Sequence, residues 1–334
     1  MNSRKIILSI VILVMVVAGS FLAYTYLVQP LAPPEKQVLI LSTTTSTYDT
    51  GLLDYLLPYF EQQYKVQVNV LSKGTGEAIQ IAQRGDADVV LVHSRTLEMP
   101  FVDAGYGVHR VGVMYNDFII IGPKEDPAGI AGTTNASYAF QRIFLAGQAG
   151  NTTFISRADK SGTNTKELSI WAGVNVKPSN KTYTWYLEAG AGMGTVLRLT
   201  NEKKAYTLTD RGTWLKFQDQ LTNLKMMTQG DKTLLNPYAV IPVNGTMFPQ
   251  RNYRMAVTFA KFLISNDGQQ LIANYKVGNQ SLFIPIARNY TAAHSLGFPT
   301  QEQEVAWYDS VNPTSLVFVM QVVSSEKRNI IRYS

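Results

Sequence analysis

The sequence predicts an α/β protein of two lobes that follows a membrane-spanning helix. Three observations support this prediction. Segments with strand-like and helix-like apolar patterns alternate from residue 37 onward. The 334 residues, 46% of them hydrophobic, are enough for two lobes with substantial cores. An apolar stretch near the N-terminus is long enough to cross a bilayer.

The N-terminal stretch predicts an uncleaved membrane anchor. The apolar run covers residues 6–27, and a spanning helix needs about 20 residues. Arg4 and Lys5 precede the run, whereas residues 29–35 after it carry no positive charge, so the lobes are expected outside the cytoplasm. A cleaved signal peptide is the alternative, although its apolar core is normally shorter. Because there is no cysteine, a lipid-modified anchor is excluded, and residues 28–36 are expected to form a proline-rich spacer.

The composition excludes several classes of function. The chain has no cysteine, which excludes disulfides, thiolate metal sites and cysteine nucleophiles. Its three histidines, His93, His109 and His294, lack the spacing of a metal motif, so neither a resident metal nor a cofactor is expected. The net charge of +6 is scattered along the chain, so no nucleic-acid partner is expected. Nucleophile-elbow and phosphate-loop motifs are absent, and an enzyme is not expected.

Potential glycosylation sites agree with an outside location. The Asn-x-Ser/Thr motif is the acceptor for N-linked glycans on secreted chains. It occurs at Asn135, Asn151, Asn180, Asn244, Asn279 and Asn289. Single matches arise by chance in chains rich in asparagine and threonine, but the set favours an exposed, extracytoplasmic glycoprotein.

The first lobe is expected to begin at residue 37. Runs of branched apolar residues predict its strands, and apolar residues at helical spacing predict its helices. Strands are expected at residues 37–42, 66–71, 87–92 and 112–122, with helices at 51–64 and 76–84. This order predicts a parallel sheet with helices on both faces, and ligands bind such sheets at the carboxyl ends of the strands.

Turn signals at Gly122-Pro123 and Asp126-Pro127 predict the crossing into a second lobe. Helices are expected there at residues 138–146, 162–171 and 193–203, with strands at 153–156 and 205–209. A strand at 236–243 then returns the chain, and helices follow at 250–265 and from 267. The expected domains are the anchor and spacer at 1–36, lobe 1 at 37–121 and 237–287, lobe 2 at 122–236, and a C-terminal extension of open role at 288–334. Within that extension, the apolar run at 315–323 is too short to span a bilayer.

Small hydroxyl and glycine residues recur where a predicted strand ends and a helix begins. They form three segments, Thr43-Thr44-Thr45-Ser46, Gly74-Thr75-Gly76 and Ser161-Gly162-Thr163. A helix N-terminus offers free N–H groups, hydroxyls add directional donors, and glycine lets a ligand approach the backbone. Each segment alone is more often a helix cap or a turn. Their repetition predicts an anion site between the lobes.

Arg110 is the cationic candidate for this site, because it lies close to the predicted crossing and its planar fork suits oxyanions. A surface or inter-lobe ion pair is the alternative role for Arg110. Arg157 and Lys160 flank the third segment, where charges are often only solvated. Arg211 has Asp210 beside it as an ion-pair partner.

Four stretches carry a resemblance to a known family. They are LSTTTSTYD at 41–49, GDADVVLVH at 85–93, ISRADKSGT at 155–163 and AYTLTDRGT at 205–213. In this order they resemble the tungstate-binding proteins of ABC transporters, the TupA-type family, and the likeness extends from about residue 37 to about residue 287. The resemblance implies a type II periplasmic-binding-protein fold. The anchor and residues 288–334 depart from the family pattern.

The resemblance also implies a function and a set of site residues. The chain is expected to bind tungstate outside the cytoplasm and to deliver it to an ABC permease. Binding of molybdate or another oxyanion, or a role as sensor or adaptor of a signalling system, are the alternatives. The implied ligand-binding residues are Thr43, Thr44, Thr45, Ser46, Thr75, Arg110, Ser161, Gly162, Thr163 and Thr207.

Overall fold

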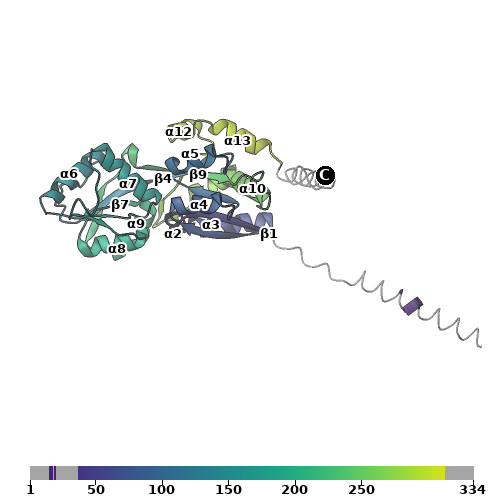
Figure 1. Ribbon diagram of the computed structural model, residues 1–334, viewed down its shortest axis with the longest axis horizontal. Coiled ribbons are helices and arrows are strands. Elements are labelled where there is room, and N and C mark those ends of the chain that lie inside the picture. The colour runs from purple at the N-terminus through teal and green to yellow at the C-terminus, as the bar shows by residue number, and fades with distance from the viewer. Residues whose placement is uncertain (1–14, 18, 20–36, 313–334) are drawn as a thin grey trace, which may run out of the picture. The chain divides into compact units, whose positions relative to one another are not determined.

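The computed structural model describes residues 15–17, 19 and 37–312 (Figure 1). The chain divides into a unit at Met1–Gln37 and a unit at Val38–Ser334. In the first unit, residues 15–17 and 19 are helical. The predicted anchor at 6–27 therefore lies largely outside the described residues, as does the apolar run at 315–323. Among the residues that are described, no helix is both long enough and apolar enough to cross a membrane.

Lobe 1 is built on a mixed sheet with the strand order β12-β4-β9-β3-β1-β2. The strands are β1 (Gln37–Thr44), β2 (Val66–Lys73), β3 (Val89–Val92), β4 (Val111–Pro123), β9 (Leu235–Pro242) and β12 (Ile284–Pro285). Strands β1 and β3 are parallel, whereas β9 is antiparallel to both β3 and β4. The parallel arrangement predicted from the first stretch is confirmed for β1 and β3. The sheet as a whole is mixed, because β9 enters lobe 1 from the opposite direction as it returns from lobe 2.

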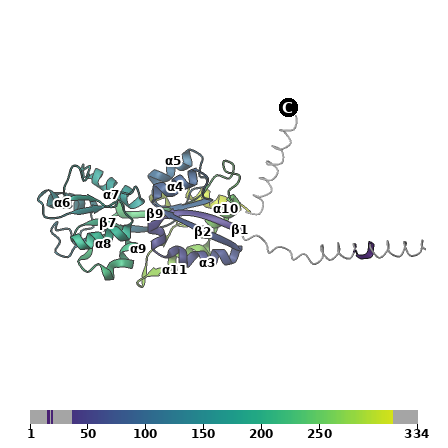
Figure 2. The same cartoon turned by 60° about the horizontal axis from the view of Figure 1, so that its bottom comes forward.

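Helices cover both faces of this sheet. Figure 2 shows α3 (Leu52–Tyr64) and α11 (Asn266–Asn274) on one side, and α4 (Thr75–Gln83) and α5 (Arg95–Asp103) on the other. The leucines of α3 and Phe60 are buried against α10 (Tyr253–Ile264), where Phe60 meets Phe259 with ring centroids 5.0 Å apart. Tyr59 lies away from this core and is 47% exposed. The helix predicted at 51–64 is therefore confirmed as α3.

Two strands carry the chain between the lobes. Residues 111–117 of β4 pair with β9, and residues 118–123 pair with β7 (Thr207–Asp210) and β8 (Leu224–Thr228) of lobe 2. The first crossing therefore lies between Asp117 and Phe118, earlier than the turn signals predict. In the second crossing, β9 begins at Leu235, and its Asn236 lies opposite Asn116 of β4.

Lobe 2 is smaller and has its own aromatic core. Its further strands are β5 (Phe154–Ser156) and β6 (Tyr186–Glu188), which pair in parallel, and its helices are α6 (Ala136–Gln148), α7 (Gly162–Gly173), α8 (Met193–Lys203) and α9 (Arg211–Phe217). Trp171 packs between Phe140 and Phe154, with ring centroids 4.4 and 5.3 Å away. Short elements complete the fold at α2 (Thr45–Asp49), η1 (Gln218–Gln220), η2 (Lys232–Leu234), β10 (Lys276–Val277) and β11 (Gln280–Ser281).

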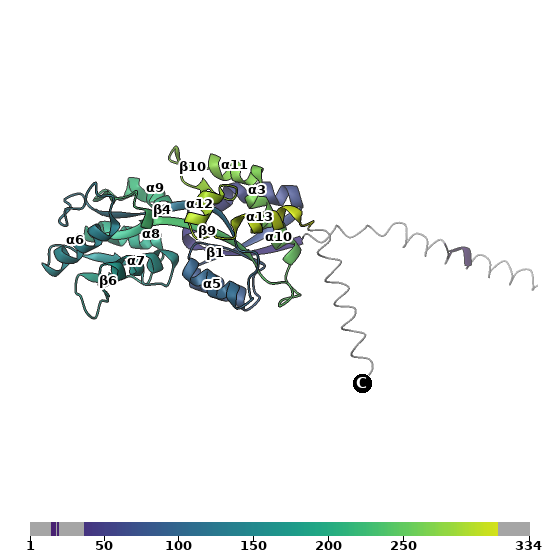
Figure 3. The same ribbon diagram turned by 90° about the horizontal axis from the view of Figure 1, so that it is seen from above.

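The first part of the predicted C-terminal extension belongs to lobe 1. It forms α12 (Tyr290–Ser295) and α13 (Gln301–Ser310), and α13 lies alongside α10 (Figure 3). The buried side chain of Gln301 accepts from Gly112 N and donates to Gly112 O, each at 2.8 Å. The hydroxyl of Tyr308 donates to His109 O at 2.8 Å. These contacts make α13 a cover for β4.

Candidate oxyanion site

The first hydroxyl segment is held rigidly where β1 ends. Thr44 caps α2, because its Oγ1 accepts from Thr47 N at 3.1 Å. The same oxygen lies 2.6 Å from Thr47 Oγ1 and 3.1 Å from Ser46 Oγ. Thr43 Oγ1 donates to Leu91 O at 2.7 Å, which commits its proton to the neighbouring strand β3. The buried hydroxyls of Thr44, Ser46 and Thr47 therefore form one cluster.

His93 packs against this cluster from the end of β3. Its Nε2 lies 3.0 Å from Thr44 Oγ1 and 3.2 Å from Ser46 Oγ. Its Nδ1 lies 2.9 Å from Asn236 Oδ1, on the strand that crosses between the lobes. Because β1 and β3 are parallel neighbours, the residues that follow them meet at one edge of the sheet.

Burial lowers the pKa of His93 to about 4. The nearby cations Arg157 and Lys166 lower this pKa further, whereas the hydrogen bond to Asn236 opposes the shift. At neutral pH the ring is therefore uncharged and carries one proton. One of its nitrogens donates a hydrogen bond and the other accepts one.

The third segment reaches His93 from lobe 2. Ser161 caps α7 by accepting from Asn164 N at 3.2 Å, and Gly162 N donates to Thr75 Oγ1 at 3.1 Å. That bond joins lobe 2 to the second hydroxyl segment in lobe 1. A Cβ added to Gly162 would lie 2.8 Å from Cε1 of His93, so only glycine permits this approach. The structure thus brings the three predicted segments together around one imidazole ring.

Arg157, which follows β5, supplies the buried cation of the site. Its side chain is 2% exposed, and its Nε and Nη2 donate to Asp159 Oδ2 at 3.1 and 2.6 Å. Nη2 also lies 3.5 Å from Thr45 Oγ1 of the first segment. Within residues 37–312, Nη1 of Arg157 and Oγ1 of Thr163 are buried without a hydrogen-bond partner. A buried donor left unsatisfied costs about 1–3 kcal/mol, and a bound oxyanion would satisfy both.

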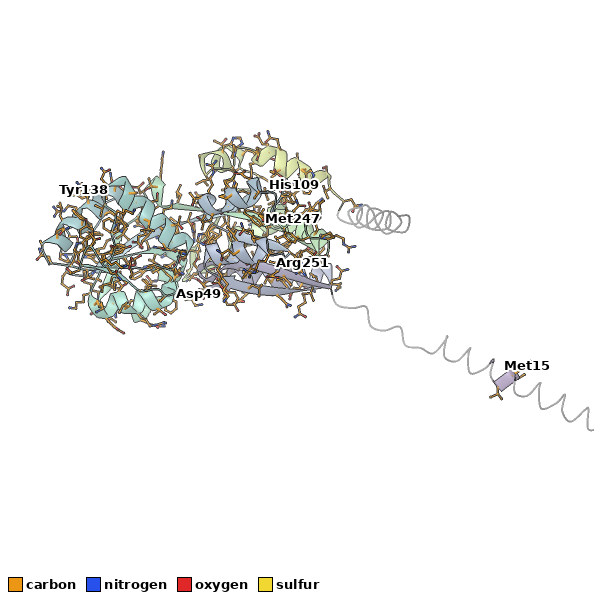
Figure 4. The ribbon with its side chains drawn as sticks, in the orientation of Figure 1. Met15, Asp49, His109, Tyr138, Met247 and Arg251 are labelled. Atoms are coloured by element: carbon orange, nitrogen blue, oxygen red, sulfur yellow. The ribbon has the colours of Figure 1, made fainter. Side chains whose placement is uncertain are left out.

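The charge of Arg157 also acts on two carboxyl groups beside the site. Burial raises the pKa of Asp49, and the cations Lys216 and Arg157 oppose that rise. Burial likewise raises the pKa of Asp210, against hydrogen bonds from Thr213 and the charge of Arg157. Asp49 lies where the two lobes meet (Figure 4), and its carbonyl oxygen accepts from Lys216 Nζ at 2.7 Å. The guanidinium group of Arg157 is therefore central to the junction of the lobes.

The prediction that Arg110 binds the ligand is corrected. Nε and Nη2 of Arg110 contact Glu98 Oε2 at 2.9 and 2.7 Å, and Nη1 donates to Gly297 O at 3.2 Å. Its guanidinium also lies 4.2 Å from the ring centroid of Phe298. Glu98 is 1% exposed and needs a cation beside it, so Arg110 serves the packing of α5 against the chain that leads to α13.

Thr207, like Thr43, is a predicted residue whose hydroxyl is committed elsewhere. Its Oγ1 donates to Ile155 O at 2.6 Å and so joins β7 to β5. Thr44, Thr45, Ser46, Thr75, Ser161, Gly162 and Thr163 all lie at the junction of the lobes. Sequence reasoning missed the roles of His93 and Arg157. The available signal was their position, because each is a polar residue directly after a buried strand.

Comparison with known proteins agrees with this geometry. The sequence profile of the PBP superfamily domain matches residues 31–267. A tungstate-binding protein TupA of Peptoclostridium acidaminophilum is 42% identical over 240 residues, which are 72% of this chain and 82% of that protein. The chain belongs to the TupA family. Its two-lobed α/β architecture is the PBP-like fold that the resemblance implied.

Solved structures of TupA-family relatives support the same assignment. The tungstate ABC transporter structure from Geobacter sulfurreducens is 47% identical, with a TM-score of 0.64, and the match covers 71% of this chain and 98% of that chain. The tungstate-binding protein TupA of Desulfovibrio alaskensis G20 is 40% identical, also with a TM-score of 0.64, covering 75% of this chain and 98% of that chain. The first of these structures is described as a tungstate ABC transporter and the second as a tungstate-binding protein.

Proposed function

We propose that this chain captures tungstate outside the cytoplasm and delivers it to an ABC permease, without catalysing a reaction. The observation that carries the proposal is the pair of unsatisfied buried donors on Arg157 and Thr163. Both residues belong to lobe 2 segments that meet lobe 1: Nη2 of Arg157 lies 3.5 Å from Thr45 Oγ1, and Thr163 follows Gly162, whose N–H donates to Thr75. Tungstate itself is proposed because the relatives with solved structures are tungstate-binding proteins.

The charge balance of the site suits a dianion held mostly by neutral donors. Arg157 is a buried cation at the junction, and Asp159 already neutralises part of its charge. Hydroxyl and backbone N–H groups therefore supply most of the binding, each contributing about 1.5–3 kcal/mol when the acceptor is charged. Closure of the lobes excludes water, which strengthens these bonds because the effective dielectric falls. A tetrahedral oxyanion gives such donors several acceptor oxygens at once.

Selectivity between tungstate and molybdate does not follow from this chemistry. Both are tetrahedral dianions of nearly the same size, so hydroxyl donors hold them alike. Molybdate is therefore the second candidate ligand. Phosphate differs, because at neutral pH it carries a proton that needs an acceptor.

Titration calorimetry on the purified chain tests the proposal. Tungstate is expected to bind at sub-micromolar concentration, and sulfate and phosphate far more weakly. Replacing Arg157 by Ala removes at least one charge-assisted bond and is expected to weaken binding tenfold or more. Arg142→Ala is the matched control, because Arg142 is an exposed arginine of α6 in the same lobe. Tight binding of phosphate without binding of tungstate would overturn the proposal.

The membrane anchor and the glycans are further parts of the proposal. The apolar run at 6–27 would tether the lobes to the outer face of the membrane. Five of the six sequons have exposed asparagines, namely Asn135, Asn151, Asn180, Asn279 and Asn289. The amide nitrogen of Asn244 instead donates to Gly105 O at 2.8 Å and is not free for a glycan. Mass spectrometry of the native protein is expected to find residues 6–27 retained and Asn244 unmodified; a mature chain that begins after residue 27 would remove the anchor.

A further inference from the structure

A chain of buried polar side chains connects the two crossing strands to the first hydroxyl segment. Asn116 of β4 and Asn236 of β9 lie opposite each other, and their amide groups are 2.8 Å apart. Asn236 then contacts Nδ1 of His93 at 2.9 Å, and Nε2 of His93 contacts Thr44 and Ser46. All five side chains are less than 9% exposed. Water therefore does not satisfy them, and each hydrogen must have a definite direction.

The direction of every bond in this chain depends on which nitrogen of His93 carries the proton. In the arrangement described, Asn236 Nδ2 points at Asn116 Oδ1, so Asn236 Oδ1 accepts from Nδ1 of His93. Nε2 would then be unprotonated and would accept a hydrogen bond from the hydroxyl of Thr44 or Ser46. That arrangement leaves Nδ2 of Asn116 buried and, within residues 37–312, without a partner. It also points a hydroxyl proton away from the ligand.

Rotating both amide groups by 180° reverses the chain and gives Nδ2 of Asn116 a partner. The hydroxyl of Tyr238, which accepts from Nδ2 of Asn236 at 3.2 Å before the rotation, then donates to Oδ1 of Asn236 instead. Nδ2 of Asn116 then donates to Oδ1 of Asn236, and Nδ2 of Asn236 donates to Nδ1 of His93, over unchanged distances. The proton of His93 moves to Nε2, which donates to Thr44 or Ser46. The oxygen of Asn116 takes the unpaired position, and an unpaired acceptor is tolerated in proteins better than an unpaired donor.

We propose that His93 is a positioning residue: its Nε2–H donates to the paired hydroxyls of Thr44 and Ser46, so that the proton of Thr44 is directed to Thr47 and the proton of Ser46 faces the oxyanion. This inference rests on the proposed function, since it concerns the donors of the same site. Oγ1 of Thr44 then accepts from Thr47 N and from His93, so its own proton goes to Thr47 Oγ1, 2.6 Å away. Ser46 Oγ, 3.2 Å from Nε2, also receives the His93 hydrogen, and its own proton is left for the ligand. Burial, assisted by the charges of Arg157 and Lys166, lowers the pKa of His93 and keeps the ring neutral, so a single proton decides the direction.

The position of the ring also connects the hydroxyls to lobe closure. Gly162 of lobe 2 packs directly on the face of His93, and the lobe 1 partner of Gly162 N is Thr75. Asn236 holds the other side of the ring from the crossing strand β9. A movement of Asn236 on the crossing strand β9 is therefore transmitted to Thr44 and Ser46 by the side chain of His93.

The first test reads the tautomer directly. The chain has three histidines, so a long-range nitrogen–proton correlation spectrum of protein with labelled histidine contains three ring systems. The His93→Gln variant identifies the signals of His93. We expect His93 to carry its proton on Nε2, with Nδ1 unprotonated, in the purified chain both with and without tungstate. A protonated Nδ1 in both states overturns the inference, even if tungstate binds tightly.

The second test separates positioning from simple packing. His93→Leu fills the space without a donor, and we expect it to weaken tungstate binding tenfold or more. His93→Gln places an amide N–H near the position of Nε2, and we expect it to recover most of that loss. Affinity in His93→Leu equal to the wild type overturns the inference. If His93→Leu does not fold, the tautomer measurement decides alone. If the wild-type chain binds no tungstate, the proposed function fails, and the protonation state of Nε2 still reports on the network.

Discussion

At the scale of single residues, Arg110 and Arg157 show why a cation in a sequence does not identify a binding residue. Both pair with a carboxylate, and both are largely removed from solvent. Arg110 uses all three nitrogens on Glu98 and Gly297, whereas Arg157 keeps Nη1 without a partner inside the described region. The difference lies in what surrounds each guanidinium group, and surroundings that come from distant parts of the chain are not visible in local sequence.

Two buried titratable residues at the site give stability that changes with pH in opposite directions. His93 has a pKa lowered to about 4, so folding disfavours its protonation, and stability is lost as the pH falls from about 6.5 towards 4. Glu167 in α7 accepts from Ser156, Trp171 and Tyr186, and burial nevertheless raises its pKa to about 7. Its stabilising effect is present below about 4.5 and is lost as the pH rises to about 7.

The two effects should be separable with amide variants. Each shift corresponds to about 3 kcal/mol, so they nearly cancel between pH 4.5 and 6.5 in the wild type. Relative to the wild type, His93→Gln is expected to gain stability on acidification through this range, and Glu167→Gln is expected to lose it. Urea unfolding at pH 4.5 and 6.5 measures both changes. Equal pH dependence in all three proteins would show that neither group has a shifted pKa.

At the scale of elements, α13 covers the start of β4, which the short edge strand β12 does not reach because β12 pairs only with Met114 and Tyr115. Gln301 imitates a neighbouring strand, because its amide group pairs with both N and O of Gly112. The close contact of Gly112 with Phe298 shows how tightly this cover fits, since an added Cβ would lie 2.8 Å from the ring.

Removing the Gln301 side chain should therefore weaken lobe 1 and spare the ligand site. Gln301→Ala leaves the buried N–H of Gly112 without its acceptor, and the free energy of unfolding is expected to fall by about 2–3 kcal/mol. Urea unfolding measures the loss, and calorimetry with tungstate is expected to show an affinity within twofold of the wild type. Glu302→Ala on the exposed face of α13 is the control. Unchanged stability in Gln301→Ala would mean that α13 does not support β4.

The local sequence pattern predicted most of the helices and strands, but it predicted fewer of the pairings between them. The bounds of α8 agree with the prediction, and the segment around Ser161 was recognised as a strand-to-helix junction. The crossing within β4 was misplaced because β4 is apolar throughout, and hydropathy does not change where its pairing partners change. Helices α5, α12 and α13 were not predicted. Pro100 inside α5 and the weak apolar periodicity of α13 remove the signals on which a helix prediction depends.

At the scale of the whole two-lobed unit, the fit of the lobes depends on one glycine. Gly162 has no room for a side chain, because its added Cβ would also lie 2.9 Å from Nδ1 of His93 and 3.2 Å from Thr75 Oγ1. The ring of His93 is held from behind by Asn236, so it has little freedom to move away.

Gly162→Ala is therefore expected to keep the lobes from closing fully. Tungstate affinity should fall tenfold or more, and small-angle X-ray scattering should show a smaller decrease of the radius of gyration on ligand addition than in the wild type. Gly173→Ala in the same helix is the matched control, because an added Cβ there meets nothing within 4 Å. Wild-type affinity and compaction in Gly162→Ala would contradict the closed packing of Gly162 on His93.

The distribution of the site residues over both lobes has a consequence for the release of the ligand. The hydroxyl cluster and His93 belong to lobe 1, whereas Arg157 and Thr163 belong to lobe 2. In the proposed site, neither lobe alone supplies all of the donors, so we expect a bound dianion to be retained only while both lobes surround it. A permease that separates the two lobes would remove Arg157 and the donors of lobe 2 from the anion at the same time. The anion would then dissociate without a competing ligand.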